Sequence, residues 1–297
     1  MKKEILEVEL NNFIKRTVTS LIFGVILIFI IYLGFIPYFL FIILLIILGL
    51  NEFYNLSKKI GFYNYKFFGI SFSIMISVLF FINNSEFGFF YNLSKNLIIF
   101  PTILTIFLIS LFSFSILFAK KHTDDGLIFF KEIYIKISTT LLGIFYVGFL
   151  LNHLILIRQM PVFGKNFVFS LFFCVWAMDI FAYLFGIKFG RHKISKISPK
   201  KSVEGAIAGF IFAILTSFIL HNYIFHTNFG IKNSIIIGIL IGIFGQIGDL
   251  FESMIKRSAN EKDSGKILPG HGGILDRFDS IIFVAPIFYY FTLIFIN

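Results

Sequence analysis

Residues 97–118 read LIIFPTILTIFLISLFSFSILF, and no charged side chain interrupts this stretch. A helix needs about 20 consecutive apolar residues to cross the hydrocarbon core of a bilayer, and this run is long enough. Similar apolar runs recur along the whole chain, so the sequence predicts an all-α, polytopic integral membrane protein with about nine transmembrane helices. We place these spans at residues 17–34, 36–51, 67–83, 97–118, 137–157, 167–187, 203–224, 233–251 and 279–296.

The amino-acid composition supports the same class. Hydrophobic residues make up 58% of the 297 residues and charged residues only 14%, far from the balance of a soluble domain. Phe alone supplies 45 residues, which lipid accepts on every face of a helix. The single cysteine, Cys174, lies in an apolar run, so the sequence excludes both a disulfide within the chain and a thiolate metal cage.

The positive charge follows the predicted topology. If the N-terminus lies in the cytoplasm, all but four of the 26 Lys and Arg residues fall in cytoplasmic segments. The exceptions are Lys95, Arg158, Lys165 and Lys232. Because cytoplasmic loops of membrane proteins are enriched in Lys and Arg, we attribute the net charge of +10 to topology and expect no nucleic-acid partner.

Charged residues within or beside the spans divide the chain in two. We interpret residues 1–160 as an N-terminal transmembrane scaffold of about five spans. Apart from Glu52, these spans contain almost no charged residue. Residues 161–297 form the predicted catalytic region, with about four spans and cytoplasmic loops at 188–203 and 252–278. Acidic residues in membrane spans are costly and usually functional, so the second region is where we expect chemistry.

The polar stretch from Asp249 to Asp279 carries the strongest site prediction. Asp249, Glu252, Ser253 and Lys256 share one helix face, and Asp276 and Asp279 share another at the start of the last span. Asp249, Asp276 and Asp279 would form an all-oxygen site, the ligand type that Mg²⁺ prefers.

Cations and glycines lie between these acids and suit phosphate. They are Lys256, Arg257, Lys262, Lys266 and Arg277, with Gly265, Gly270, Gly272 and Gly273. Acids for a metal, cations for phosphate oxygens and glycines for backbone contacts to an anion indicate phosphoryl transfer between a lipid and a water-soluble phosphate compound. The alternative is a cytoplasmic loop whose charges only follow topology and pair with one another. No P-loop motif is present.

A second polar stretch covers residues 179–205. Asp179, Tyr183, Gly186 and Gly190 form one helical stripe, which predicts either a polar wall or a packing face. Ser202 is the predicted N-cap of the following span, with Glu204 in its first turn. The same loop offers Ser198, Lys200 and Lys201 to an anion, although a basic loop is also what topology alone predicts.

The sequences SMIKR (253–257), KDSG (262–265) and LPGHGGILDRFD (268–279) together resemble the signature of the phosphatidate cytidylyltransferases. DIFAYLFG (179–186), ISPKKSVEG (197–205) and the pair Glu52-Phe53 are also similar to that family. The resemblance covers the C-terminal half firmly and the first half mainly in its span layout.

This resemblance implies that the cytidylyl group of CTP is transferred to phosphatidic acid, giving CDP-diacylglycerol and pyrophosphate for phospholipid synthesis. It implies a Mg²⁺-dependent homodimer in the inner (cytoplasmic) membrane of the cell, with the active site facing the cytoplasm. It leaves room for a second, monovalent cation such as K⁺. The predicted metal ligands are Asp249, Asp276 and Asp279.

We expect the remaining site residues in two groups. The catalytic group is Asp249, Lys256, Arg257, Asp276, Arg277 and Asp279. The substrate-binding group is Asp179, Tyr183, Ser198, Lys200, Lys201, Ser202, Glu204, Ser253, Lys262, Gly270, His271, Gly272 and Gly273. We expect no acid–base role for His271, because a lipid phosphate is already anionic near neutral pH.

Two alternative functions remain open at this point. A CTP-dependent polyprenol or phytol kinase would transfer the γ-phosphate to a lipid alcohol. An ion or solute transporter would need charges spread across the depth of the bilayer, whereas the acids here cluster near the predicted inner border.

Overall fold

The computed structural model describes residues 22–83, 99–117, 126–161, 163–195, 197–221, 230–268 and 272–295. Within these residues the chain forms helices and no strand, with isolated β-bridges between Lys193 and Ser202 and between Leu268 and Gly272. The all-α prediction is therefore confirmed for the described part of the chain.

Two of the helices are continuous with each other. A π-helical turn joins α6 to α7, so these three elements form one continuous helix. In chain order the elements are Ile22–Leu33, α2 (Phe35–Lys59), α3 (Lys66–Asn83), α5 (Ile99–Leu117), α6 (Gly126–Gly143), η1 (Ile144–Phe149), α7 (Leu150–Arg158), α8 (Gly164–Phe189), α9 (Val203–Leu220), α10 (Ile231–Ser258) and α11 (Leu275–Phe295).

Among the described residues, six helices are long and apolar enough to cross a membrane. They are Phe35–Lys59, Phe130–Arg158, Gly164–Phe189, Val203–Leu220, Ile231–Ser258 and Leu275–Phe295. Shorter apolar helices at Ile22–Leu33, Lys66–Ile82 and Leu104–Ser115 coincide with the other predicted spans. The multi-span class is confirmed, whereas the count of nine and the cytoplasmic N-terminus stay predictions.

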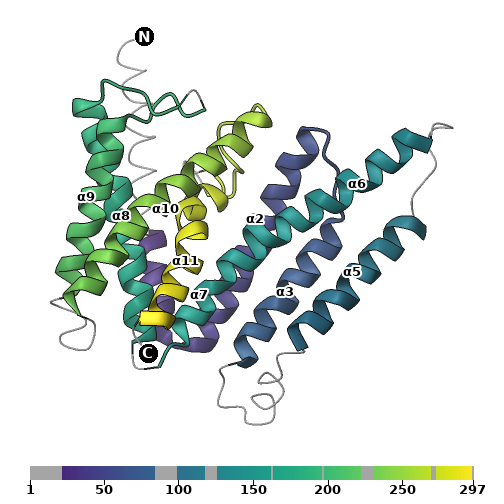
Figure 1. Ribbon diagram of the computed structural model, residues 1–297, viewed down its shortest axis with the longest axis horizontal. Helices are drawn as coiled ribbons and strands as arrows, with labels where there is room; N and C mark the ends of the chain where they lie inside the picture. The colour runs from purple at the N-terminus through teal and green to yellow at the C-terminus, as the bar shows by residue number, and fades with distance from the viewer. Residues whose placement is uncertain are drawn as a thin grey trace.

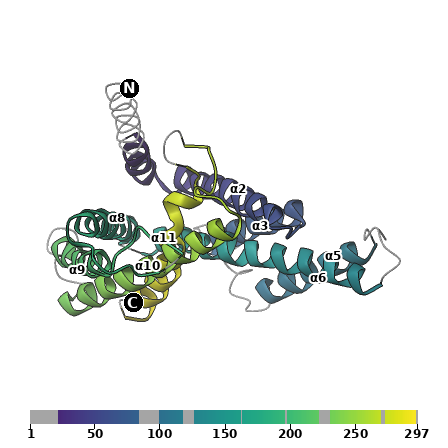
Figure 2. The ribbon, with the colours of Figure 1, turned by 90° about the horizontal axis from the view of Figure 1, so that it is seen from above.

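The helices form two groups that meet at α11. Figure 1 shows α8, α9 and α10 packed together on one side, while α2, α3, α5 and α6 spread out on the other. From above, α11 lies between the groups (Figure 2), and it contacts α10, α8, α7 and α2. Residues that begin α11 are therefore reached from both halves of the chain.

Close packing of α10 on α9 depends on small residues. A Cβ atom added at Gly238 would lie 2.6 Å from Ile214 Cα, and one at Gly242 would lie 3.2 Å from Phe210 Cα. Small residues of this kind let helix backbones approach closely in a membrane, where apolar burial does not drive helix association. This packing fixes α10 between α9 and α11, and so fixes where its polar end lies.

Candidate active site

Three charged side chains connect the end of α10 to the start of α11. Lys256 Nζ lies 2.6 Å from Asp276 Oδ1 and also pairs with Glu252, one turn earlier on α10. Glu252 is buried, with 1% of its side chain exposed. Its ion pair confirms that Glu252 and Lys256 share a helix face. A single lysine thus lies between two poorly exposed carboxylates.

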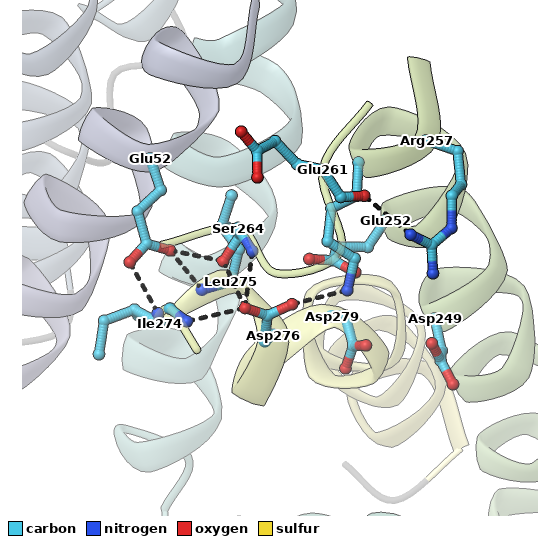
Figure 3. Close-up of polar contacts among 12 residues, drawn as sticks. Glu52, Asp249, Glu252, Arg257, Glu261, Ser264, Ile274, Leu275, Asp276 and Asp279 are labelled. Carbon is cyan, nitrogen blue, oxygen red and sulfur yellow. Dashed lines mark hydrogen bonds and ion pairs between the residues drawn. The ribbon is translucent and has the colours of Figure 1, made fainter. Parts of the chain in front are cut away.

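Asp276 organises the loop that precedes α11. Its Oδ2 accepts hydrogen bonds from Ser264 N at 2.8 Å, Ser264 Oγ at 2.9 Å and Gly273 N at 2.7 Å (Figure 3). With Lys256 on Oδ1, both of its oxygens are in use. A carboxylate in the first turn of a helix also lies at the positive end of the helix dipole. Asp276 therefore acts as a structural anchor in this arrangement.

Glu52, which comes from α2, binds the same helix start from the other side. Its two oxygens accept hydrogen bonds from Ser264 Oγ, Ile274 N and Leu275 N, each at 2.9 Å (Figure 3). Glu52 is only 3% exposed. The first N–H groups of a helix have no partner within the helix, and a buried carboxylate satisfies them well. Glu52 therefore ties the N-terminal half of the chain to α11.

Asp249 and Asp279 form a second acidic group, deeper along the same two helices. Their carboxylates point the same way from α10 and α11 in Figure 3. Asp249, Glu252 and Asp179 all lie close enough to Asp279 to interact with it electrostatically. Lys201, from the loop before α9, pairs with Asp249. The carboxylates Asp179, Asp249, Glu252, Asp276 and Asp279 thus outnumber their cations Lys201, Lys256 and Arg277.

This excess of negative charge fits a bound cation, but the structure does not bring the three predicted ligands together. Among the described residues, no three Asp, Glu, His or Cys side chains are grouped closely enough to hold a metal ion. Both carboxylate oxygens of Asp276 are bound, by Lys256, Ser264 and Gly273. Asp249 pairs with Lys201, and Asp279 accepts a hydrogen bond from Ser280 N at 2.7 Å. Mg²⁺ commonly binds through one or two carboxylates, with water and substrate phosphates completing its shell.

The 179–205 stretch forms a wall beside this acidic group. Asp179 and Tyr183 are exposed on α8, and the charges of Asp249, Lys201 and Arg277 act on Asp179. The predicted N-cap is confirmed, since Ser202 Oγ accepts a hydrogen bond from Gly205 N at 3.1 Å.

Glu204 makes contacts within its own loop. Glu204 accepts hydrogen bonds from the backbone N–H groups of Arg191 and His192 at 3.1 and 3.2 Å, and His192 Nδ1 lies 2.7 Å from it. These contacts fold the loop back onto the start of α9. Ser198 accepts a backbone hydrogen bond from Lys201 at 3.0 Å, and this turn carries Lys201 toward Asp249.

The remaining predicted residues lie in or beside the α10–α11 loop. Arg257 is exposed and donates to the Glu261 carbonyl at 2.9 Å, and Lys262 is also exposed. Ser253 is buried. Gly272 has φ +81°, a conformation that favours glycine. Gly270 and His271 lie outside the described residues.

Three further residues belong to the site although the site prediction omitted them. Glu52 and Ser264 bind the start of α11, as described above. Tyr146, on the π-helical turn, is buried with a hydroxyl that has no partner in the described structure, and the charges of Glu252, Asp279 and Asp249 act on it. The available sequence signal was the isolation of Glu52 as a lone acid closing an apolar span.

Removing the Glu52 carboxylate should destabilise the protein. Glu52→Ala leaves three donors without their acceptor, at a cost of about 1–3 kcal/mol for each one that stays buried. We expect the thermal unfolding midpoint in detergent to fall by roughly 5 °C or more. Glu132→Ala is the matched control, because Glu132 is exposed and, among the described residues, has a single ion pair, with Lys136 at 3.8 Å. Equal midpoints for the two variants would contradict the anchoring role.

Comparison with known proteins agrees with the resemblance of the signature residues. A phosphatidate cytidylyltransferase of Synechocystis sp. is 41% identical over 184 residues, which cover 53% of this chain and 62% of that protein. One of Staphylococcus saprophyticus is 43% identical over 148 residues, covering 50% and 55%. One of Bacillus subtilis is 38% identical over 155 residues, covering 52% and 57%.

These alignments span between half and two thirds of the relatives' own length. The sequence model of the cytidylyltransferase family extends further and matches residues 14–295. That range includes all helices of both groups and every residue of the site. The chain belongs to the cytidylyltransferase family.

Proposed function

We propose that this chain transfers the cytidylyl group of CTP to phosphatidic acid, giving CDP-diacylglycerol and pyrophosphate. The observation that carries this proposal is the Asp249–Asp279 pair on α10 and α11, with Lys201 of the loop before α9 bound to Asp249. The printed names of the relatives support the same substrates.

The reaction needs few proton transfers. An oxygen of the lipid phosphate attacks the α-phosphorus of CTP, and a new P–O bond forms. The bond from the α-phosphorus to the bridging oxygen of the β-phosphate breaks, and pyrophosphate leaves with that electron pair. Because the nucleophile is already anionic near neutral pH, no general base is required. The main barrier is the mutual repulsion of two anionic substrates.

The residues of this chain lower that repulsion by holding positive charge at the site. Lys201 pairs with Asp249, so a phosphate group bound near Asp249 would lie close to the positive charge of Lys201. Asp249 and Asp279 would hold Mg²⁺, and the local acidic excess is compatible with a second, monovalent cation such as K⁺. When bound, Mg²⁺ would neutralise charge on the triphosphate and on the leaving pyrophosphate. Asp276 and Glu52 keep α11 in place.

The finer topology belongs to the same proposal. Nine spans with a cytoplasmic N-terminus place all but four Lys and Arg residues in the cytoplasm. The site residues at the end of α10 and the start of α11 then face the cytoplasm at the inner membrane, where CTP is available. The resemblance suggests a homodimer.

CTP labelled at the α-phosphorus tests the reaction directly. In detergent with phosphatidic acid and Mg²⁺, we expect the label to enter the lipid fraction and pyrophosphate to be released in equal amount. A lipid kinase would leave the α-label in soluble CDP and transfer the γ-label instead, and that result would reject the proposed function. A protein that transferred neither label but moved ions in vesicles would be a transporter.

Asparagine variants should distinguish the role of Asp249 in the reaction from the role of Asp276 in anchoring α11. Asp249→Asn should lower turnover roughly 100-fold or more, because charge is lost where the substrates' charge must be balanced. Its unfolding midpoint should change little, since Asp249 is 30% exposed. Asp276→Asn should lower both turnover and the midpoint, because it leaves Lys256 with one fewer buried partner.

The control for both variants is Lys232→Gln, an exposed lysine at the opposite end of α10. It should retain both turnover and midpoint. Full activity of Asp249→Asn, or equal losses of midpoint in the two aspartate variants, would contradict these assigned roles.

A further inference from the structure

A cavity of about 660 Å³ lies between the end of α2 and the α10–α11 loop. One wall is Asn55, Lys58 and Lys59 of α2, and the other is residues 261–266 of the loop. This volume falls within the usual range for small-molecule sites, roughly 300–1,000 Å³. The cavity joins the two halves of the chain. In its lining, Lys262 is a predicted substrate-binding residue, and Lys266 and Gly265 are among the cations and glycines that the sequence analysis assigned to phosphate.

The lining selects for an anion. It contains four lysines against two acids, Glu261 and Asp263. Lys59 is paired with Glu261 at 2.5 Å, which connects the two walls and lowers the pKa of the Glu261 carboxyl. Lys58, Lys262 and Lys266 form no ion pair within the part of the chain that the structure describes. With four lysines against two acids, the lining keeps a net positive charge for a bound group.

The same lining suits a water-soluble ligand better than a lipid chain. Every lining residue is polar, charged or glycine, so no hydrophobic side chain is present to pack against an acyl group. The lysines are exposed to solvent, with 54% of the Lys59 side chain accessible. A water-soluble polyphosphate matches these properties, since its charges need several cations and it has no apolar part.

Ser264 connects this cavity to the acidic site. It lines the cavity and also donates to Asp276 Oδ2 and Glu52 Oε2, each at 2.9 Å. Asp276 in turn binds Lys256. An anion in the cavity would therefore lie against the same loop that fixes the start of α11. Gly265 keeps that loop close to Glu52, because a Cβ there would collide with the Glu52 carboxylate.

We infer that this cavity binds the polyphosphate end of the soluble nucleotide and that pyrophosphate is released from it after the reaction. The inference rests on the proposed function for its nucleotide, while the binding of polyphosphate can be measured without turnover. It gives Lys58 and Lys266, one from each half of the chain, a direct contact with substrate.

The test is the double variant Lys58→Gln/Lys266→Gln, which leaves the Lys59–Glu261 pair intact. The matched control is Lys131→Gln/Lys188→Gln, which removes the same charge from other exposed positions. In calorimetric titrations of the full chain in detergent, pyrophosphate should bind the control as it binds the wild type. The double variant should bind it about tenfold more weakly or worse.

Kinetics distinguish the source of the phosphate. The double variant should show a KM for CTP raised about tenfold, with kcat and the KM for phosphatidic acid within about twofold of the control. A raised KM for phosphatidic acid alone would assign the cavity to the lipid phosphate and overturn the inference. Unchanged binding of pyrophosphate would overturn it as well.

Failure of the proposed function gives a different result. A wild-type protein that makes no CDP-lipid, yet binds pyrophosphate in a manner that the double variant loses, would reject the proposed reaction and support the polyphosphate site.

Discussion

The buried carboxylate of Glu52 is the contact on which the arrangement of the site depends. Two helices far apart in the chain, α2 and α11, meet through its hydrogen bonds to Ser264, Ile274 and Leu275. In a membrane protein, an unsatisfied helix end inside the protein is costly, and a buried carboxylate without donors is costly too. The hydrogen bonds between them satisfy the N–H groups of the helix start and the Glu52 carboxylate at the same time. The first half of the chain is thereby part of the site as well as its support.

Around this contact the acids divide into two kinds. Glu52 and Asp276 accept hydrogen bonds from the loop and the start of α11, and their negative charge is balanced by N–H groups and Lys256. Asp249 and Asp279 have fewer such partners and lie close enough for their charges to act on each other. Rigid anchors beside an undercompensated pair are what a site for cations and phosphates requires, because the pair stays in place while its charge remains available.

Local features were predictable from the sequence, and contacts between distant segments were not. The Ser202 cap and the Glu252–Lys256 pair follow from three- and four-residue spacing, and the structure confirms both. Spacing also grouped Asp276 with Asp279 as metal ligands. Spacing could not show that Lys256, Ser264 and Gly273 bind the oxygens of Asp276. Ser264 lies in a loop, and the conformation of a loop does not follow from helical periodicity. The Glu52 contact lies more than 200 residues from its partners, so only the folded chain reveals it.

The measurement that tests this division most directly is anomalous diffraction from crystals grown with CTP and Mn²⁺ in place of Mg²⁺. We predict one anomalous peak between the carboxylates of Asp249 and Asp279, at about 2.1–2.3 Å from an oxygen of each. Asp276 should still be bound to Lys256 and Ser264 in that crystal. A peak coordinated by Asp276 with Lys256 displaced, or no peak beside Asp249 and Asp279, would contradict the account.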